Sequence, residues 1–227
     1  MSIRGSVVGR LLIDVIAAIA IMVLWLGLWS LAFILYNRHK GKAALRWVQA
    51  ACAGKGRLLD SRWLGSYRLH ARLQFPSRGF EDARVTMQFR RPFPAHWILD
   101  CWRKQKETLT FEANLGGSPS FHLEVVRHRW SARSRSVGRP RDQREWEVHH
   151  PGPLILTTRT HWKEDPTSEL NALMTVRQQD VLQVRFRPES PQFSVTVTLD
   201  ALADPATAAG FLSTLRELAA GASAHRQ

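Results

Sequence analysis

The sequence LLIDVIAAIAIMVLWLGLWSLAFILY, at residues 11–36, is apolar throughout except for a single charged residue, Asp14, and a serine. As an α-helix rising about 1.5 Å per residue, it is longer than the roughly 30 Å hydrocarbon core of a bilayer. Because a carboxylate is costly in hydrocarbon, we expect Asp14 at the headgroup end, with residues 15–36 crossing the membrane. Tyr36 is expected at the opposite interface, and Trp47 would extend the same aromatic belt.

A cleaved signal peptide is the alternative interpretation of this stretch. Signal peptides have an apolar region of about half this length, which ends at a small-residue cleavage site. The sequence Ser30-Leu31-Ala32 fits such a site loosely, but cleavage there would leave the apolar residues 33–36 exposed at the new N-terminus. The sequence therefore favours an uncleaved, single-pass anchor.

Basic residues are unequally distributed on the two sides of the anchor. Arg4 and Arg10 precede it, whereas four basic residues follow it closely. In membrane proteins the cytoplasmic flanks carry the excess of lysine and arginine. We therefore expect a protein of the cell (inner) membrane whose large C-terminal part is cytoplasmic. The four following residues are Arg38, Lys40, Lys42 and Arg46.

The formal net charge of +13 is confined to the membrane-proximal half of the soluble part. Residues 1–36 carry +1, residues 37–147 carry +13, and residues 148–227 carry −1. Such a field attracts polyanions, among them anionic lipid headgroups, nucleic acid and acidic proteins. We divide the chain into a leader and anchor (1–36), a juxtamembrane helix (37–54), a basic, mostly β half (55–147) and a near-neutral half (148–227).

Strict alternation of apolar and polar residues predicts strands in the basic half, at residues 67–75, 85–89 and 109–115. Strands of this pattern have one face on a core and one in water, which indicates an antiparallel sheet. At 121–130 the alternation slips at Val125-Val126, which predicts a β-bulge. The expected fold class is α+β: one N-terminal transmembrane helix, followed by a soluble domain of antiparallel sheet covered by helices.

The near-neutral half predicts an αββα-like order after a short strand at 154–156. Helices over 165–174 and 204–220 each begin with Asp-Pro, which is typical of an N-cap followed by the first helical position. Residues 182–199 lie between these helices and are expected to form a hairpin. The apolar stripe of the last helix, which includes Phe211, is expected to pack on the sheet.

The segment 94–106 admits two interpretations. Its apolar residues recur at helical spacing around Trp97 and Trp102, and Arg103, Lys104 and Lys106 follow them. We expect a helix that crosses over the sheet, because neighbouring strands need a cover. The alternative is a basic, tryptophan-bearing helix that rests on the membrane interface.

Residues 127–147 are crowded with arginines and serines and are expected to form a mobile loop, because like charges repel and few apolar residues are present to bury. We expect this loop and the juxtamembrane residues to contact anionic headgroups or another polyanion, at about 1 kcal/mol for each basic residue near an anionic surface. The residues assigned to this contact are Arg38, Lys40, Lys42, Arg46, Arg103, Lys104, Lys106, Arg133, Arg135, Arg139 and Arg141.

The two cysteines, Cys52 and Cys101, are far apart in the chain and form no CxxC pattern. A small secreted domain stapled by disulfides would use more cysteines. Two free thiols agree with a reducing cytoplasm, and a single disulfide between them stays open.

No motif for catalysis, for a metal or for a cofactor is present in the sequence. The phosphate-cradling patterns GxxxxGK[ST] and GxGxxG are absent, as are GxSxG and HExxH. Glu112 and Glu124 could form a carboxylate pair on neighbouring strands, as in a glycoside hydrolase, but cross-strand ion pairs with arginines explain them more simply. We therefore predict no catalytic or metal-binding residue and no cofactor.

The function expected from these features is binding or scaffolding at the membrane, as an accessory subunit of a membrane complex. The expected partners are anionic lipid and a protein. Two alternatives come from other classes: a membrane-tethered enzyme with its site in the sheet cleft, and a membrane-tethered nucleic-acid binder, for which no recognisable binding module is present.

Overall fold

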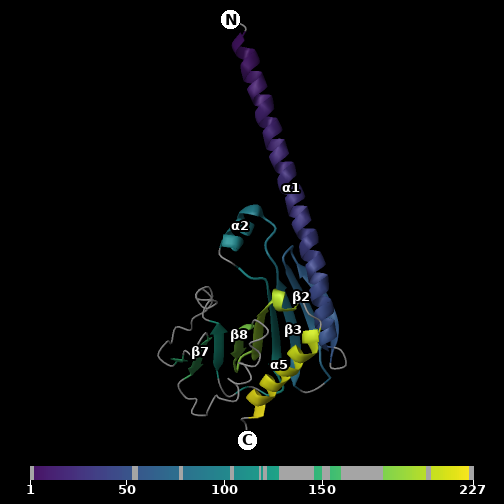
Figure 1. Cartoon of the computed structure of the whole chain (residues 1–227), viewed down its shortest axis with the longest axis vertical. Coiled ribbons are helices and arrows are strands. Elements are labelled where there is room, and N and C mark those ends of the chain that lie inside the picture. The colour runs from purple at the N-terminus through teal and green to yellow at the C-terminus, as the bar shows by residue number, and fades with distance from the viewer. Residues whose placement is uncertain are drawn as a thin grey trace.

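In the computed structural model, a long N-terminal helix leads into one antiparallel sheet, and a C-terminal helix packs against that sheet (Figure 1). The structure describes residues 3–52, 56–76, 79–102, 105–117, 119, 122–127, 146–149, 154–159, 181–202 and 206–224. The α+β fold class predicted from the sequence is confirmed.

Helix α1 (Ile3–Cys52) is continuous through the apolar stretch and the predicted juxtamembrane helix. At about 1.5 Å per residue its 50 residues extend roughly 75 Å. Among the described residues it is the one helix long and apolar enough to cross a membrane, and no residue of its apolar window is buried. Asp14 and Tyr36 lie on exposed parts of α1, about 33 Å apart along its axis, which is close to the thickness of a bilayer core.

Nine strands of the described chain form one sheet, in the order β1-β2-β3-β4-β9-β8-β5-β7-β6, and every pair of neighbours is antiparallel. The basic and near-neutral parts of the chain interleave in it, because β4 pairs with β9 and β5 lies between β8 and β7. The strands are β1 (Arg57–Leu64), β2 (Arg68–Gln74), β3 (Phe80–Gln88), β4 (Thr108–Leu115), β5 (Leu123–Arg127), β6 (Trp146–His149), β7 (Leu154–Arg159), β8 (Val181–Phe186) and β9 (Phe193–Thr198).

The core lies between one face of this sheet and two helices, the C-terminal third of α1 and helix α5 (Ala206–Ala224). The rings of Trp47 and Phe211 connect the two helices, with centroids 5.3 Å apart. Short helix η3 (Leu199–Leu202) follows β9 and contacts α1. The predicted apolar stripe of the last helix is confirmed, since Phe211 and Leu215 are buried.

Helix α2 (Pro94–Trp102) corrects the prediction that this segment covers the sheet. The helix contains no buried residue. It projects from the sheet on the side toward which α1 extends (Figure 1). The ring of Trp97 contacts the rings of Trp29 and Phe33 on α1. A helix that covered the sheet would bury its apolar side chains, and α2 does not.

Two further differences concern the strands. The bulge predicted at Val125-Val126 is wrong, because β5 pairs with β7 and β8 without a register shift. Val125 and Val126 are both buried although successive residues of a strand point to opposite faces, so both faces of β5 are covered there. Strands β1 and β6 were not predicted; β1 has a register shift between Leu58 and Asp60 that disrupts its alternation.

Candidate functional site: the junction between anchor and sheet

The side chains that join the anchor to the sheet come from one face of α1. Lys40 and Gly41 lie three and four residues after Asn37, and Ala44 lies four and three residues after them, which places all four on one side of a helix. They begin directly after Tyr36, where the apolar stretch ends. One side of α1 therefore becomes the docking face of the domain where the apolar stretch ends.

Asn37 connects α1 to two loops of the sheet. Its side chain is completely buried. Its Nδ2 donates hydrogen bonds to the carbonyl oxygen of Ser66, in the β1–β2 turn, at 3.1 Å, and to that of Arg90, after β3, at 3.0 Å. Because a buried amide is costly unless it is hydrogen-bonded, these two bonds fix the rotation and the height of α1 relative to the sheet.

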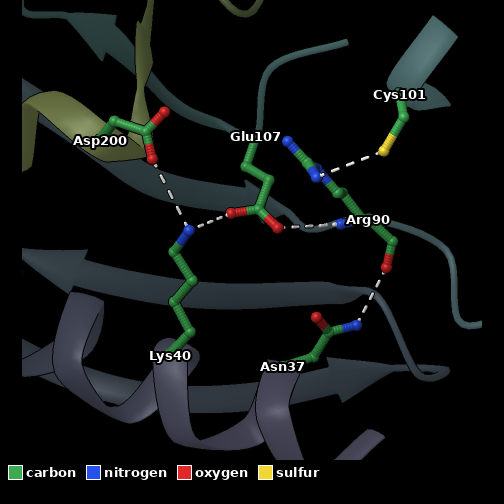
Figure 2. A network of polar contacts seen from close by, with 6 residues as sticks. All are labelled: Asn37, Lys40, Arg90, Cys101, Glu107 and Asp200. Carbon is green, nitrogen blue, oxygen red and sulfur yellow. Dashed lines mark hydrogen bonds and ion pairs between the residues drawn. The ribbon is translucent and has the colours of Figure 1, made fainter. Parts of the chain in front are cut away.

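Lys40 and Glu107 form the charged part of the junction. Glu107 is only 6% exposed and lies directly before β4; its carboxylate accepts a hydrogen bond from Lys40 Nζ and another, at 3.3 Å, from the backbone N–H of Arg90 (Figure 2). Lys40 Nζ also lies 3.7 Å from the carboxylate of Asp200 in η3. One helix side chain thereby contacts both the start of β4 and the end of β9.

The pKa of Lys40 lies above its ordinary value. Partial burial opposes the charged form, but the hydrogen bond and the attraction from Glu107, aided by Asp200, outweigh it. A lysine whose pKa is raised on folding contributes stability below its unfolded pKa, and this contribution is lost as the pH rises through the folded pKa. The Lys40 cation is therefore held throughout the neutral range.

Gly41 permits a close approach between α1 and β1. A Cβ atom at this position would lie 2.6 Å from the Trp63 ring, which is closer than real Cβ atoms approach. Trp63 itself stacks on Phe89, with ring centroids 5.5 Å apart. A glycine is therefore needed at this turn of α1 for the edge of the sheet to pack against the anchor.

The contacts of Asn37 with Arg90 and of Lys40 with Glu107, which we call the two clamps, lie at the two ends of the β3–α2–β4 connection. Arg90 begins this connection and is held by Asn37, while Glu107 ends it and is held by Lys40 (Figure 2). The Arg90 guanidinium additionally donates to Cys101 Sγ at 3.6 Å, which ties the end of α2 back to the same loop. The position of α2 is thus determined by residues of the anchor helix.

The predicted headgroup-contact residues separate into three groups. The side chains of Arg38, Lys42 and Arg46 are exposed on α1, and that of Lys106 is exposed after α2. Lys40 instead points into the junction. The predicted residues Arg103, Lys104, Arg133, Arg135, Arg139 and Arg141 lie outside the described residues, as does the predicted helix over 165–174.

Trp47 does not have the interfacial position expected from the sequence. Its side chain is 5% exposed and packs in the core against Phe211. Headgroups cannot reach a ring enclosed between α1, the sheet and α5. The reason is that α1 enters the domain within three turns of Tyr36, so that Trp47 belongs to the core and not to the membrane boundary.

The carboxylate pair considered for an enzyme is separated by the sheet order. Glu112 and Glu124 occupy the same register row, but β9 and β8 lie between their strands. At about 4.8 Å for each strand the separation is about 14 Å, which is longer than the 5–9.5 Å between the carboxyl groups of glycoside hydrolases. Glu124 instead accepts hydrogen bonds from Arg185 and Gln183. The cross-strand ion pair is the explanation that the geometry supports.

The cysteines differ in their surroundings, and both are free. Burial raises the pKa of the Cys52 thiol, and the nearby Arg216 only partly offsets this. Cys52 is therefore a core side chain that remains protonated and unreactive. Cys101 is exposed on α2.

The sequence interpretation missed Asn37 and Glu107 as junction residues. A signal for Asn37 was present, since it is the first polar residue after the apolar stretch and lies three positions before Lys40. Glu107 carried no signal, because its partner is 67 positions away in the chain. No protein-family model matches this chain, and no curated protein matches it.

Proposed function

We propose that this is a single-pass protein of the cell (inner) membrane whose cytoplasmic domain binds a partner as a scaffolding or accessory subunit. The observation that carries the proposal is the continuity of α1. The helix runs without a break from its apolar stretch into the core, where Trp47 and Val48 are buried. The anchor is therefore part of the domain, which argues against its removal as a signal peptide.

The rigid connection between α1 and the sheet suits a domain that holds one surface toward a partner better than a domain that is only tethered to the membrane. A flexible linker keeps a domain near the membrane but leaves its height and orientation free. Asn37, Lys40 and Gly41 instead hold the sheet at one rotation about α1. A partner fixed in the same membrane then meets the surface already oriented, and less ordering entropy opposes binding.

The surface best suited to a partner is the outer face of β1–β3. The register places the exposed side chains of Arg72 and Arg84 directly opposite each other there. In the same row Asp60 on β1 lies opposite Arg72 and Glu112 on β4 lies opposite Arg84, and the four exposed arginines of the face still outnumber these two carboxylates. We assign an acidic protein segment as the partner. The exposed arginines of this face are Arg62, Arg68, Arg72 and Arg84.

Anionic lipid is the second partner in the proposal. Arg38, Lys42 and Arg46 are exposed and follow the apolar stretch within three turns, where headgroup phosphates lie if α1 crosses the bilayer. Each contributes about 1 kcal/mol of attraction to an anionic surface. The positive charge also favours the cytoplasmic orientation.

The orientation is tested on intact cells with a thiol reagent that does not cross membranes. A cysteine replaces the exposed Glu189 in a chain in which Cys52→Ala and Cys101→Ser remove the native thiols. We expect labelling only after the membrane has been permeabilised. Labelling of intact cells would contradict a cytoplasmic domain.

The partner surface is tested by photo-crosslinking in cells. A photoreactive residue at Arg72 or at Arg84 is expected to give one adduct of the same mass, whereas the exposed Glu217 on α5 serves as the matched control and gives none. Protease sensitivity identifies a protein partner, and nuclease sensitivity would support the nucleic-acid alternative instead. Adducts of equal yield at all three positions, or at none, would refute the binding face.

A further inference from the structure

Helix α2 exposes large apolar side chains although it belongs to the soluble part of the chain. The Trp102 side chain is 82% exposed and that of Ile98 is 60% exposed. Phe93, directly before the helix, and Leu99 are exposed as well. Large apolar side chains exposed together on one short helix mark a binding site for a protein or a membrane.

The anchor provides the reason for assigning this surface to the membrane. Trp97 of α2 packs against Trp29 and Phe33 of α1, with ring centroids 5.9 and 6.2 Å away. These two α1 residues lie within the apolar stretch, about 6–12 Å along the axis from Asn37. Interfacial helices bury their apolar faces about 5–10 Å into the boundary between headgroups and acyl chains. Where α1 crosses a bilayer, α2 therefore lies at the depth of such helices.

Charge and sidedness on α2 agree with this depth. On a helical projection, Ile98 and Trp102 share one side, and His96 and Asp100 lie opposite them. Basic residues flank the helix in the sequence on both sides, where anionic headgroups would surround its ends. They are Arg90, Arg91, Arg103, Lys104 and Lys106.

We propose that α2 is a second membrane contact: an interfacial helix that inserts its Phe93–Trp102 apolar side into the lipid leaflet next to the anchor. The clamps at Arg90 and Glu107 hold this helix against α1, so that the domain rests on the bilayer at two places. Two contacts fix the tilt of the sheet relative to the membrane, which a single helix leaves free. The inference rests on the proposed crossing of the membrane by α1.

Site-directed spin labelling of the full chain in liposomes with anionic lipid tests this inference. Single cysteines replace Trp102, Leu24 in the middle of the apolar stretch, or Glu217 on α5, in the Cys52→Ala, Cys101→Ser background. Collisions of each label with oxygen, which concentrates in lipid, are compared with collisions with a water-soluble nickel complex. The expected order of the oxygen-to-nickel ratio is Leu24, then Trp102, then Glu217.

Each other outcome overturns the inference in a recognisable way. A Trp102 label with the aqueous ratio of Glu217, while Leu24 reports lipid, means that α2 lies in water although the anchor spans the membrane. A Trp102 label protected from both reagents means that a protein covers α2. An aqueous ratio at Leu24 would refute the membrane span itself, and the proposed function with it.

Introducing a negative charge on either side of α2 tests whether its apolar side is the one that inserts into lipid. With the label at Trp102, Ile98→Glu places a carboxylate on the apolar side of α2 and is expected to shift the ratio toward that of water. His96→Glu, the matched control on the opposite side, is expected to leave the ratio unchanged. Because α2 has no buried residue, neither change disturbs the core. Equal effects of the two substitutions would contradict the assigned orientation.

Discussion

Asn37→Asp is the sharpest test of the junction, because it replaces the amide donor by an oxygen of the same size. The two carbonyl oxygens that Asn37 now contacts, at 3.1 and 3.0 Å, would face a carboxylate. The least unfavourable response is protonation of the new carboxyl group. Against an ordinary pKa of about 3.9, this costs about 4 kcal/mol at pH 7. The protonated group restores one of two hydrogen bonds, so another loss of about 1 kcal/mol follows.

The expected destabilisation is therefore about 5 kcal/mol at pH 7 and about 2.5 kcal/mol at pH 5. The sign follows from a folded pKa above the unfolded one, which makes the folded state bind more protons and lose stability as the pH rises. Asn37→Leu removes both bonds without a titrating group and is the control, with a loss of about 2 kcal/mol at either pH. Pulse proteolysis of the full chain in detergent measures the free energy of unfolding of both variants at the two pH values. A loss below about 1 kcal/mol without pH dependence would mean that water reaches position 37.

Three further changes test the same packing by the same assay. Lys40→Met is expected to destabilise the fold by about 2–3 kcal/mol, because it leaves the Glu107 carboxylate buried without its cation. Glu107→Gln should cost less, because Lys40 then remains partly solvated. Equal losses of stability for the two variants would contradict this difference in burial. Phe211→Ala should cost about 3–5 kcal/mol, because the ring is 3% exposed, and a loss below about 0.5 kcal/mol would place the ring in water. Gly41→Leu should lower the stability, whereas Gly27→Leu, where a Cβ meets no atom within 4 Å, should not; equal behaviour would refute the close approach to the sheet.

The spacing of apolar residues in the sequence was sufficient to predict the strands and helices that place one face on the core and the other in water. Alternation over 67–75 and 109–115 predicted β2 and β4 because each has one face on the core. The stripe of α5 was predicted for the same reason. Edge strand β1 was not predicted, because most of both its faces is exposed and its register shifts between Leu58 and Asp60. Its sequence therefore shows no regular alternation of apolar and polar residues.

The junction and the position of α2 depend on contacts that no local pattern encodes. A lone Asn37 and a lone Glu107 become a site only when β2, β3 and β4 are placed beside α1. The helical spacing of α2 was correct, but spacing does not say which surface a helix meets. Trp97 packs against rings of α1, because the clamps hold the β3–β4 connection beside the anchor.

The rigid connection between the anchor and the domain can be measured as a distance distribution between two spin labels. Strand β9 runs over about 17 Å from Phe193 to Thr198 and leads into η3, where Asp200 lies 3.7 Å from Lys40. Glu189 precedes the other end of β9, so labels at His39 and Glu189 are separated by a measurable distance. Both labels are introduced without the native thiols, and electron–electron distances are recorded in lipid nanodiscs. A single distribution as narrow as that of a pair within the domain, Arg84 and Glu189, is the predicted result. A distribution at least twice as broad would contradict the rigid junction.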